Sequence, residues 1–409
     1  MEGNSEFCRA KINRIPHLPG LTFPHLRIAV NTRFLLPGKL EGLGWYTHEL
    51  LRRMVINHPE DTFIFLFDRP FHPDFIYGKN VIPVVIGPRA RHPLAWLIWF
   101  EWSVPRALAH YSAEIFFSPD AHLSLRSKVP AVMTVHDLIP LQYPEQVRWW
   151  ARTYYRWFIP HFLRRADQLV AVSGFTKQEI EKTGIATNHI SVVYNGCREG
   201  FSPLPEAEKQ QVRSTFAGGQ EYFFYTGAIH PRKNIPRLLR AFDTFKAATG
   251  ASVKLLLAGR FAWQTGEVKT AFEQARYRQD IHFLGYVPET DLTRLMASAL
   301  ALTYPSTHEG FGLPLLEAMN AGTPALTARA SCLPEIAGDA ALLVDPYSEK
   351  EIAAGLEQLY RDAALRAALV THGNLRRANF SWDAAAAQLY GLLVSAASSG
   401  HKKEASNDG

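Results

Sequence analysis

The sequence has few cysteines and no long apolar run. Its 409 residues include three scattered cysteines, which suit neither a disulfide framework nor a metal site with closely spaced ligands. No window reaches the ~20 apolar residues that a membrane-spanning helix needs. The first residues, MEGNSEFCRAKINRIP, also lack the apolar core of a signal peptide. These absences favour a protein of the reducing cytoplasm.

Two nucleotide-binding fingerprints are also missing. The chain contains neither G-x-G-x-x-G nor G-x-x-x-x-G-K-[ST], which argues against a dehydrogenase and a P-loop enzyme. Its net charge of +6 suits an anionic nucleotide, an anionic lipid surface or nucleic acid, and does not choose among them.

Short apolar runs alternate with longer amphipathic stretches, which is the pattern of βαβ units and parallel sheets. The expected strands of the first half are residues 26–30, 62–67, 81–86, 115–118, 131–135, 169–172 and 190–193. Those of the second half are residues 222–226, 253–258, 281–284, 299–304, 324–328 and 341–344. Gly and Pro interrupt the pattern at residues 196–208, where we place the domain linker. Two parallel sheets facing each other would bind a ligand between the carboxyl ends of their strands.

The stretch HEGFGLPLLEAMNAGTP, residues 308–324, carries the most specific signal. Pro314 suits the first position of a helix, and the glycines at positions 310 and 312 let backbone approach a ligand closely. The free amides at such a helix start can face an anion. Glu309 in the loop and Glu317 in the first helical turn can then point to the same side. We interpret this block as a site for a sugar nucleotide.

This block resembles the paired-glutamate signature of retaining glycosyltransferases of family 4, in which seven residues separate the two glutamates. The resemblance implies the GT-B fold, an α/β architecture of two Rossmann-like, doubly wound parallel-sheet domains that face a central cleft. It implies that Glu309 binds hydroxyls of the donor sugar and that Glu317 binds the ribose. The loop residues Gly310, Phe311, Gly312 and Leu313 would meet the donor phosphates.

The domain limits combine this resemblance with the break in the pattern. We expect a mobile extension over residues 1–25, an acceptor-side domain over 26–200 and a nucleotide-sugar domain over 201–380. A helix over residues 381–394 would cross back to the first domain, and residues 395–409 would form a disordered tail.

The segment YTGAIHPRKNIPRLLRAF offers a second part of the site. Gly227 ends a strand, and Arg232 and Lys233 precede a helix whose cap would be Asn234. Two cations at a helix start can clamp a diphosphate and stabilise its charge as it departs. The resemblance gives these two residues that role, although many relatives carry an arginine where this chain has Ala228. The other interpretation is a solvated helix start with two surface cations.

The first domain supplies weaker candidates. Gly42 and Gly44 resemble the glycine loop that relatives place over the donor phosphates, and a tight turn is the alternative. His136 follows a buried strand, and the resemblance places it near the donor sugar, whereas a structural pair with Asp137 is the alternative. The expected catalytic residues are therefore Glu309, His136, Arg232 and Lys233.

The resemblance predicts transfer of a hexose with retention, from GDP-mannose or a UDP-sugar to a saccharide or a lipid-linked saccharide, in cell-surface polysaccharide or glycoconjugate synthesis. We expect no metal and no cofactor, because the two cations can stabilise the leaving diphosphate. A glycosidase is disfavoured because Glu317 lies beside phosphate-binding elements. A sugar-nucleotide epimerase of the same fold and a catalytically silent sugar-nucleotide-binding scaffold remain as alternatives.

Residues 147–167, VRWWARTYYRWFIPHFLRRAD, form an aromatic and basic helix. Arg148, Arg152 and Arg156 recur at every fourth position, with aromatic side chains on another side. This pattern is typical of a helix on an anionic bilayer, which would place the protein at the inner face of the membrane. It equally fits a core-packed helix with a solvated arginine stripe. No RNA-binding motif supports a nucleic-acid partner.

Overall fold

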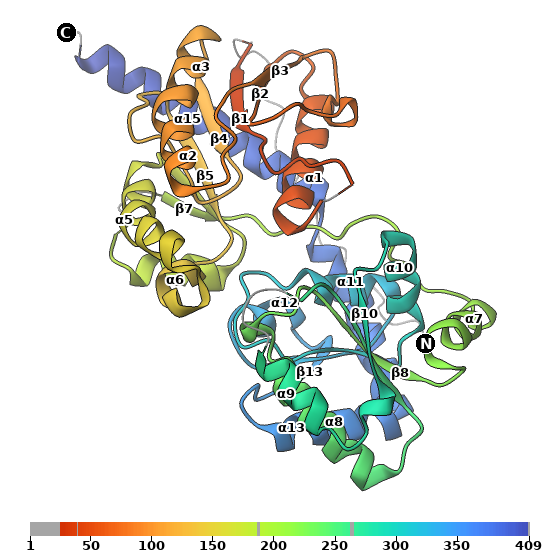
Figure 1. Cartoon of the computed structure of the whole chain (residues 1–409). Coiled ribbons are helices and arrows are strands. Elements are labelled where there is room, and N and C mark those ends of the chain that lie inside the picture. The colour runs from red at the N-terminus through yellow and green to blue at the C-terminus, as the bar shows by residue number, and fades with distance from the viewer. Residues whose placement is uncertain (1–24, 39, 186–188, 262–265, 408–409) are drawn as a thin grey trace, which may run out of the picture.

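The computed structural model describes residues 25–407 except 39, 186–188 and 262–265. The expected N-terminal extension lies outside the described residues apart from His25. Two lobes, each built around a parallel sheet, follow one another along the chain (Figure 1). The expected α/β class with two doubly wound sheets is confirmed.

The first sheet has the strand order β3-β2-β1-β4-β5-β6-β7, with every pair parallel. Its strands are β1 Arg27–Asn31, β2 Thr62–Phe67, β3 Val81–Val85, β4 Ile115–Ser118, β5 Ala131–Val135, β6 Gln168–Ala171 and β7 His189–Val192. The helices of this lobe are α1 Gly42–Asn57, α2 Pro93–Ile98, the π-helical η2 Trp99–Ser103, α3 Val104–His110, α4 Ile139–Gln142, α5 Trp149–Arg165 and α6 Gly174–Lys182, with 3-10 turns η1 Pro73–Phe75 and η3 Pro144–Gln146.

The second sheet has the order β10-β9-β8-β11-β12-β13 and is also parallel. Its strands are β8 Tyr222–Thr226, β9 Lys254–Ala258, β10 Ile281–Gly285, β11 Ala301–Tyr304, β12 Ala325–Ala328 and β13 Ala341–Val344. Its helices are α7 Glu206–Ala217, α8 Ile235–Thr249, α9 Gly266–Gln274, α10 Glu289–Ser298, α11 Leu313–Ala321, α12 Leu333–Ala337, α13 Glu349–Arg361 and α14 Ala363–Arg376, with 3-10 turns η4 Pro231–Lys233, η5 Arg278–Asp280 and η6 Arg377–Asn379.

The central strands explain why short apolar runs could be recognised in the sequence. Every residue of β5 and of β8 is buried, because helices cover both faces of each sheet. Residues that follow the carboxyl ends of β5 and β11 meet between the lobes, as His136 and Gly310 do. No helix in the described part of the chain is long and apolar enough to span a bilayer.

The last helix, α15 Trp382–Asn407, packs against α1 of the first lobe. The hydroxyl of Ser381 accepts hydrogen bonds from the first amides of this helix, as expected for a cap. The helix continues to Asn407, so the expectation of a disordered tail from residue 395 is wrong for residues 395–407. The buried side of this helix extends past residue 395, because Leu389, Leu393 and Ala396 recur at helical spacing.

Candidate functional site

Glu309 is the centre of a buried group of charged and polar side chains. It lies in the loop between β11 and α11 and is 6% exposed. One carboxylate oxygen accepts a hydrogen bond from Arg232 at 2.7 Å. The other accepts from the Lys233 ammonium at 2.5 Å and from the Tyr304 hydroxyl at 2.8 Å. Three of the predicted catalytic residues therefore form one cluster, with Arg232 and Lys233 bonded to the glutamate that precedes the glycine loop.

The charges in this cluster shift one another's protonation. Burial alone would raise the pKa of Glu309, but the adjacent Arg232 and Lys233 outweigh it and lower that pKa to about 2. Burial and repulsion from Arg232 lower the pKa of Lys233 to about 8, against the opposing effect of Glu309. At neutral pH the carboxylate and both cations are therefore charged, and Lys233 lies close to its titration point.

The backbone between β8 and α8 places the two cations. The chain leaves β8 at Gly227, turns through η4, and enters α8 after Asn234, whose φ of 61° is left-handed. Asn234 does not cap the helix with its side chain, contrary to expectation. Its amide donates instead to the carbonyls of Pro305 and Pro346, which ties this turn to two neighbouring loops. Lys233 is consequently 7% exposed, so the interpretation as a solvated helix start is wrong for it.

Glu317 lies in α11 and faces the linker between the lobes. The helix begins at Leu313, so Pro314 is its second residue and Glu317 lies beyond the first turn in which it was expected. Its carboxylate accepts from Arg198 at 2.6 and 2.9 Å, and the Arg198 guanidinium lies 5.4 Å from the ring centre of Trp45. Sequence reasoning missed Arg198, although it lies within residues 196–208, where the linker was expected.

The glycine loop lies directly against the first lobe. A Cβ atom on Gly310 would fall 1.7 Å from the carbonyl oxygen of His136, so only glycine fits there. The Gly310 carbonyl accepts a hydrogen bond from the Ser173 hydroxyl at 2.7 Å. Gly312 has a φ of +87° just before α11, and Phe311 is buried. The loop expected at the donor phosphates is thus also a contact between the two lobes.

His136 follows β5 and is partly buried, with its ring centre 4.6 Å from that of Tyr46. Its Nε2 lies 2.8 Å from the carbonyl oxygen of Pro119, and a carbonyl can only accept, so Nε2 carries the proton. Burial lowers the pKa of His136, which keeps the ring neutral at neutral pH with Nδ1 as an acceptor. Asp137 accepts instead from the amide of Ile139. The alternative of a structural pair between these two side chains is therefore not what the structure contains.

Gly42 and Gly44 lie in the first turn of α1, whereas a loop was expected. A Cβ on Gly44 would come within 2.9 Å of the Phe34 carbonyl oxygen, so close packing explains this glycine. A Cβ on Gly42 would meet nothing within 4 Å. Neither observation assigns a ligand to this turn.

Glu335, in α12, is a second residue that sequence reasoning missed. Its carboxylate accepts from the backbone amides of Gly174 and Phe175 at 2.7 and 2.9 Å, and from the Tyr194 hydroxyl at 2.9 Å. The two amides begin α6 of the first lobe. No local pattern marks Glu335, because the partners are about 160 positions away in the chain.

Among the described residues, one group could hold a metal ion by its geometry. His58, Glu60 and Asp61 place ligand atoms within 4.8 Å of one another where α1 ends and β2 begins. This is the amino end of the strands, opposite the Glu309 cluster. Asp61 already accepts from the Leu26 amide and the Tyr390 hydroxyl. The group is therefore explained by structural hydrogen bonds.

Comparison with known proteins identifies the family of this chain. Residues 40–199 match the family model described as Glycosyltransferase Family 4, and residues 206–376 match that of Glycosyl transferases group 1. The O-antigen chain mannosyltransferase B of Escherichia coli is 32% identical over 284 residues, which cover 68% of this chain and 73% of that protein. The chain belongs to glycosyltransferase family 4. The resemblance found in the paired-glutamate block is thereby confirmed.

A further relative and two solved structures extend the comparison. The O-antigen chain mannosyltransferase RfbU of Salmonella typhimurium is 26% identical over 290 residues, covering 68% of this chain and 76% of that one. The sucrose-phosphate synthase of Thermosynechococcus elongatus superposes with a TM-score of 0.72 at 17% identity, covering 90% and 98% of the two chains. HepE of Anabaena, solved with UDP-glucose, gives 0.71 at 18% identity and 91% and 100% coverage. These structures establish that the fold is that of GT-B glycosyltransferases.

Proposed function

We propose that this family 4 enzyme transfers mannose from GDP-mannose, with retention of configuration, to a saccharide or lipid-linked saccharide in cell-surface polysaccharide synthesis. The observation that carries the proposal is the Glu309 cluster, in which one carboxylate holds two cations beside a glycine loop and a helix start. The mannose and the polysaccharide come from the two O-antigen chain mannosyltransferases that the chain resembles. UDP-sugars are the second donor class, since HepE binds UDP-glucose.

The cluster suits the departure of a nucleoside diphosphate. As the bond between the sugar C1 and the phosphate oxygen breaks, negative charge grows on the diphosphate, and Arg232 and Lys233 can stabilise it. The Lys233 ammonium donates to the Tyr304 hydroxyl and to the Glu309 carboxylate, and its third N–H can donate to a phosphate oxygen. Two cations at this place make a divalent metal unnecessary, so we propose a metal-independent reaction.

Retention is what the resemblance of the paired-glutamate block to retaining family 4 enzymes implies, and because we assign no protein nucleophile, we propose that the acceptor attacks from the front face. Glu309 is held by Arg232 and Lys233, and we assign it to the sugar hydroxyls. The acceptor oxygen bonds to C1 on the face from which the diphosphate leaves, and a departing phosphate oxygen takes the acceptor's proton. His136, neutral and with Nδ1 free of its proton, orients the sugar by accepting from a hydroxyl.

A thermal-shift panel tests the donor site. GDP, UDP, ADP and their common sugar conjugates are added to wild type and to Glu317→Ala, with and without EDTA. A ligand at 100 times its Kd stabilises the folded state by about 2.7 kcal/mol, a readily measured rise in Tm. We expect guanine nucleotides to stabilise the wild type, EDTA to make no difference, and Glu317→Ala to lose the response.

Glu289→Ala is the matched control, because Glu289 is a more exposed carboxylate that lies 3.5 Å from the same Arg198. It should respond as the wild type does. A panel without any stabilising nucleotide, or a Glu317→Ala protein that responds normally, would favour the silent scaffold. Interconversion of sugar nucleotides without an acceptor would favour the epimerase.

We also propose that the first lobe touches an anionic membrane. On α5, Tyr154 and Phe162 are buried in the lobe, whereas Trp149 and Trp157 are 79% and 66% exposed. Arg152 and Arg156 of the same helix are exposed, as is Arg148 directly before it. The helix therefore has one side packed in the lobe and another that exposes tryptophans and arginines. Exposed tryptophans interleaved with arginines suit the interface of an anionic bilayer.

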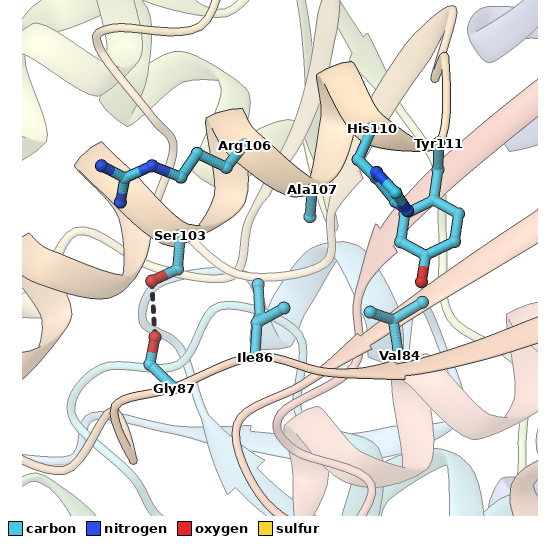
Figure 2. Close-up of a pocket in the computed structure, with 8 residues that line it drawn as sticks. All are labelled: Val84, Ile86, Gly87, Ser103, Arg106, Ala107, His110 and Tyr111. Carbon is cyan, nitrogen blue, oxygen red and sulfur yellow. Dashed lines mark hydrogen bonds between the residues drawn. The ribbon is translucent and has the colours of Figure 1, made fainter.

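The neighbouring helical segment continues this surface. Leu94, Ile98 and Trp102 recur at every fourth position over α2 and η2 and are 63%, 39% and 38% exposed. Beside them, an open hollow of about 530 Å³ lies between the edge strand β3 and α3. Figure 2 shows Val84 and Ile86 of the sheet edge facing Ala107 and His110 of α3 across it. We assign the exposed apolar side chains of α2 and η2, together with those of α5, to contact with lipid.

Vesicle co-sedimentation tests the membrane proposal. Wild type should bind vesicles of phosphatidylcholine with phosphatidylglycerol, and binding should fall with added salt and in pure phosphatidylcholine. The double variant Trp149→Ala/Trp157→Ala should lose binding by about tenfold or more. Tyr286→Ala, which removes a 69% exposed aromatic ring from the other lobe, should not. Equal binding by the two variants would refute this surface.

A further inference from the structure

Glu335 makes a contact between the lobes that the chemistry described above does not use. It belongs to α12 of the second lobe, and its two carboxylate oxygens each accept one amide from the start of α6 in the first lobe. A carboxylate that accepts two amides at a helix start makes charge-assisted hydrogen bonds and lies at the positive end of the helix dipole. The contact is thus stronger than a pair of neutral hydrogen bonds.

The helix that Glu335 holds is the one that meets the glycine loop. Ser173 is the N-cap of α6: its hydroxyl accepts from the Thr176 amide and donates to the Gly310 carbonyl. Glu335 therefore holds the residues next to the point where the first lobe touches the loop that follows Glu309. A shift of α6 away from Glu335 would move Ser173 and the Gly310 contact with it.

The residues of the proposed site are divided between the two lobes that this contact joins. Glu309, Arg232, Lys233 and Glu317 all belong to the second lobe, whereas His136 belongs to the first. Donor binding needs mainly the second lobe, but transfer needs His136 and an acceptor presented by the first. The backbone of His136 meets the second lobe at Gly310, where there is no room for even a Cβ atom.

We propose that Glu335 is a positioning residue that holds the lobes in the arrangement required for transfer. It does so through the first turn of α6, and it does not contact the donor. This inference rests on the proposed function, because the step that the arrangement of the lobes serves is the proposed glycosyl transfer. It predicts a specific separation of effects: loss of Glu335 lowers the rate of transfer and leaves donor affinity unchanged.

Glu335→Gln tests this with the smallest change, since glutamine keeps the shape but can accept only one of the two amides. Its kcat for transfer from GDP-mannose should fall by about tenfold or more, and its Kd for GDP should stay within about twofold of wild type. Asp243→Asn is the matched control. Asp243 also accepts two consecutive amides, those of Arg276 and Tyr277, but entirely within the second lobe. Its kcat and Kd should both match wild type.

Small-angle X-ray scattering of the ligand-free protein gives an independent readout. Glu335→Gln should have a larger radius of gyration than wild type, and Asp243→Asn should not. An unchanged kcat, or a GDP affinity that falls by the same factor as kcat, would overturn the proposal. If wild type itself binds no nucleotide, the proposed function fails, and the scattering comparison still decides whether Glu335 holds the lobes together.

Discussion

Lys233 allows a sharp prediction, because its lowered pKa lies near physiological pH. Burial and the Arg232 charge bring the pKa of this ammonium to about 8 in the ligand-free protein. The charged form binds the diphosphate, so affinity should be highest below pH 8 and should fall as pH rises through that value. Between pH 7 and pH 9 the charged fraction falls from about 0.9 to about 0.1, which predicts about a tenfold loss of GDP affinity.

The assay is isothermal titration calorimetry with GDP at half-unit steps from pH 6.5 to pH 9.5. Over this range Glu309 stays ionised, since its pKa is lowered to about 2. Lys233→Arg is the matched control, because arginine keeps its charge throughout. Its absolute affinity can differ, but its profile should be flat from pH 7 to pH 9. A flat wild-type profile, or the same slope in Lys233→Arg, would refute the role given to Lys233.

Three further predictions follow from the same contacts. Gly310→Ala should reduce the initial rate of transfer by about 100-fold or more, because its Cβ would collide with the His136 carbonyl. Gly391→Ala is the control and should remain active, since its Cβ would meet nothing within 4 Å. Tyr304→Phe should lose about 1–2 kcal/mol of unfolding free energy in urea, since its buried hydroxyl bonds both Lys233 and Glu309, and an unchanged midpoint would contradict this. Dialysis against EDTA should leave the transfer rate unchanged, and restoration of a lost rate by Mg²⁺ or Mn²⁺ would show that the two cations do not suffice.

The fold and the paired-glutamate block could be predicted because their signals are local. Buried parallel strands give short apolar runs, so each run expected between residues 26 and 344 overlaps a strand. The length of α15 was also local information, since Leu389, Leu393 and Ala396 continue its stripe past residue 394. That stripe was overlooked because the flanking serines and glycine resemble a tail.

The contacts of the site could not be predicted because they join distant parts of the chain. Arg232 was placed at a diphosphate, but its partner in the structure, Glu309, lies 77 positions away. Arg198 and Glu335 were missed for the same reason, since only the fold brings them to Glu317 and to α6. The position of Glu317 beyond the first helical turn reflects the general uncertainty of helix boundaries.

The central claim is retaining mannosyl transfer at the Glu309 cluster. The most direct test incubates the enzyme with GDP-mannose and octyl α-mannoside and determines the product's anomeric configuration by NMR, alongside Glu309→Gln. We predict an α-linked mannose from wild type and at least about a 100-fold lower rate from the variant, which keeps the loop but loses the carboxylate. A β-linked product, or full activity in Glu309→Gln, would contradict the account.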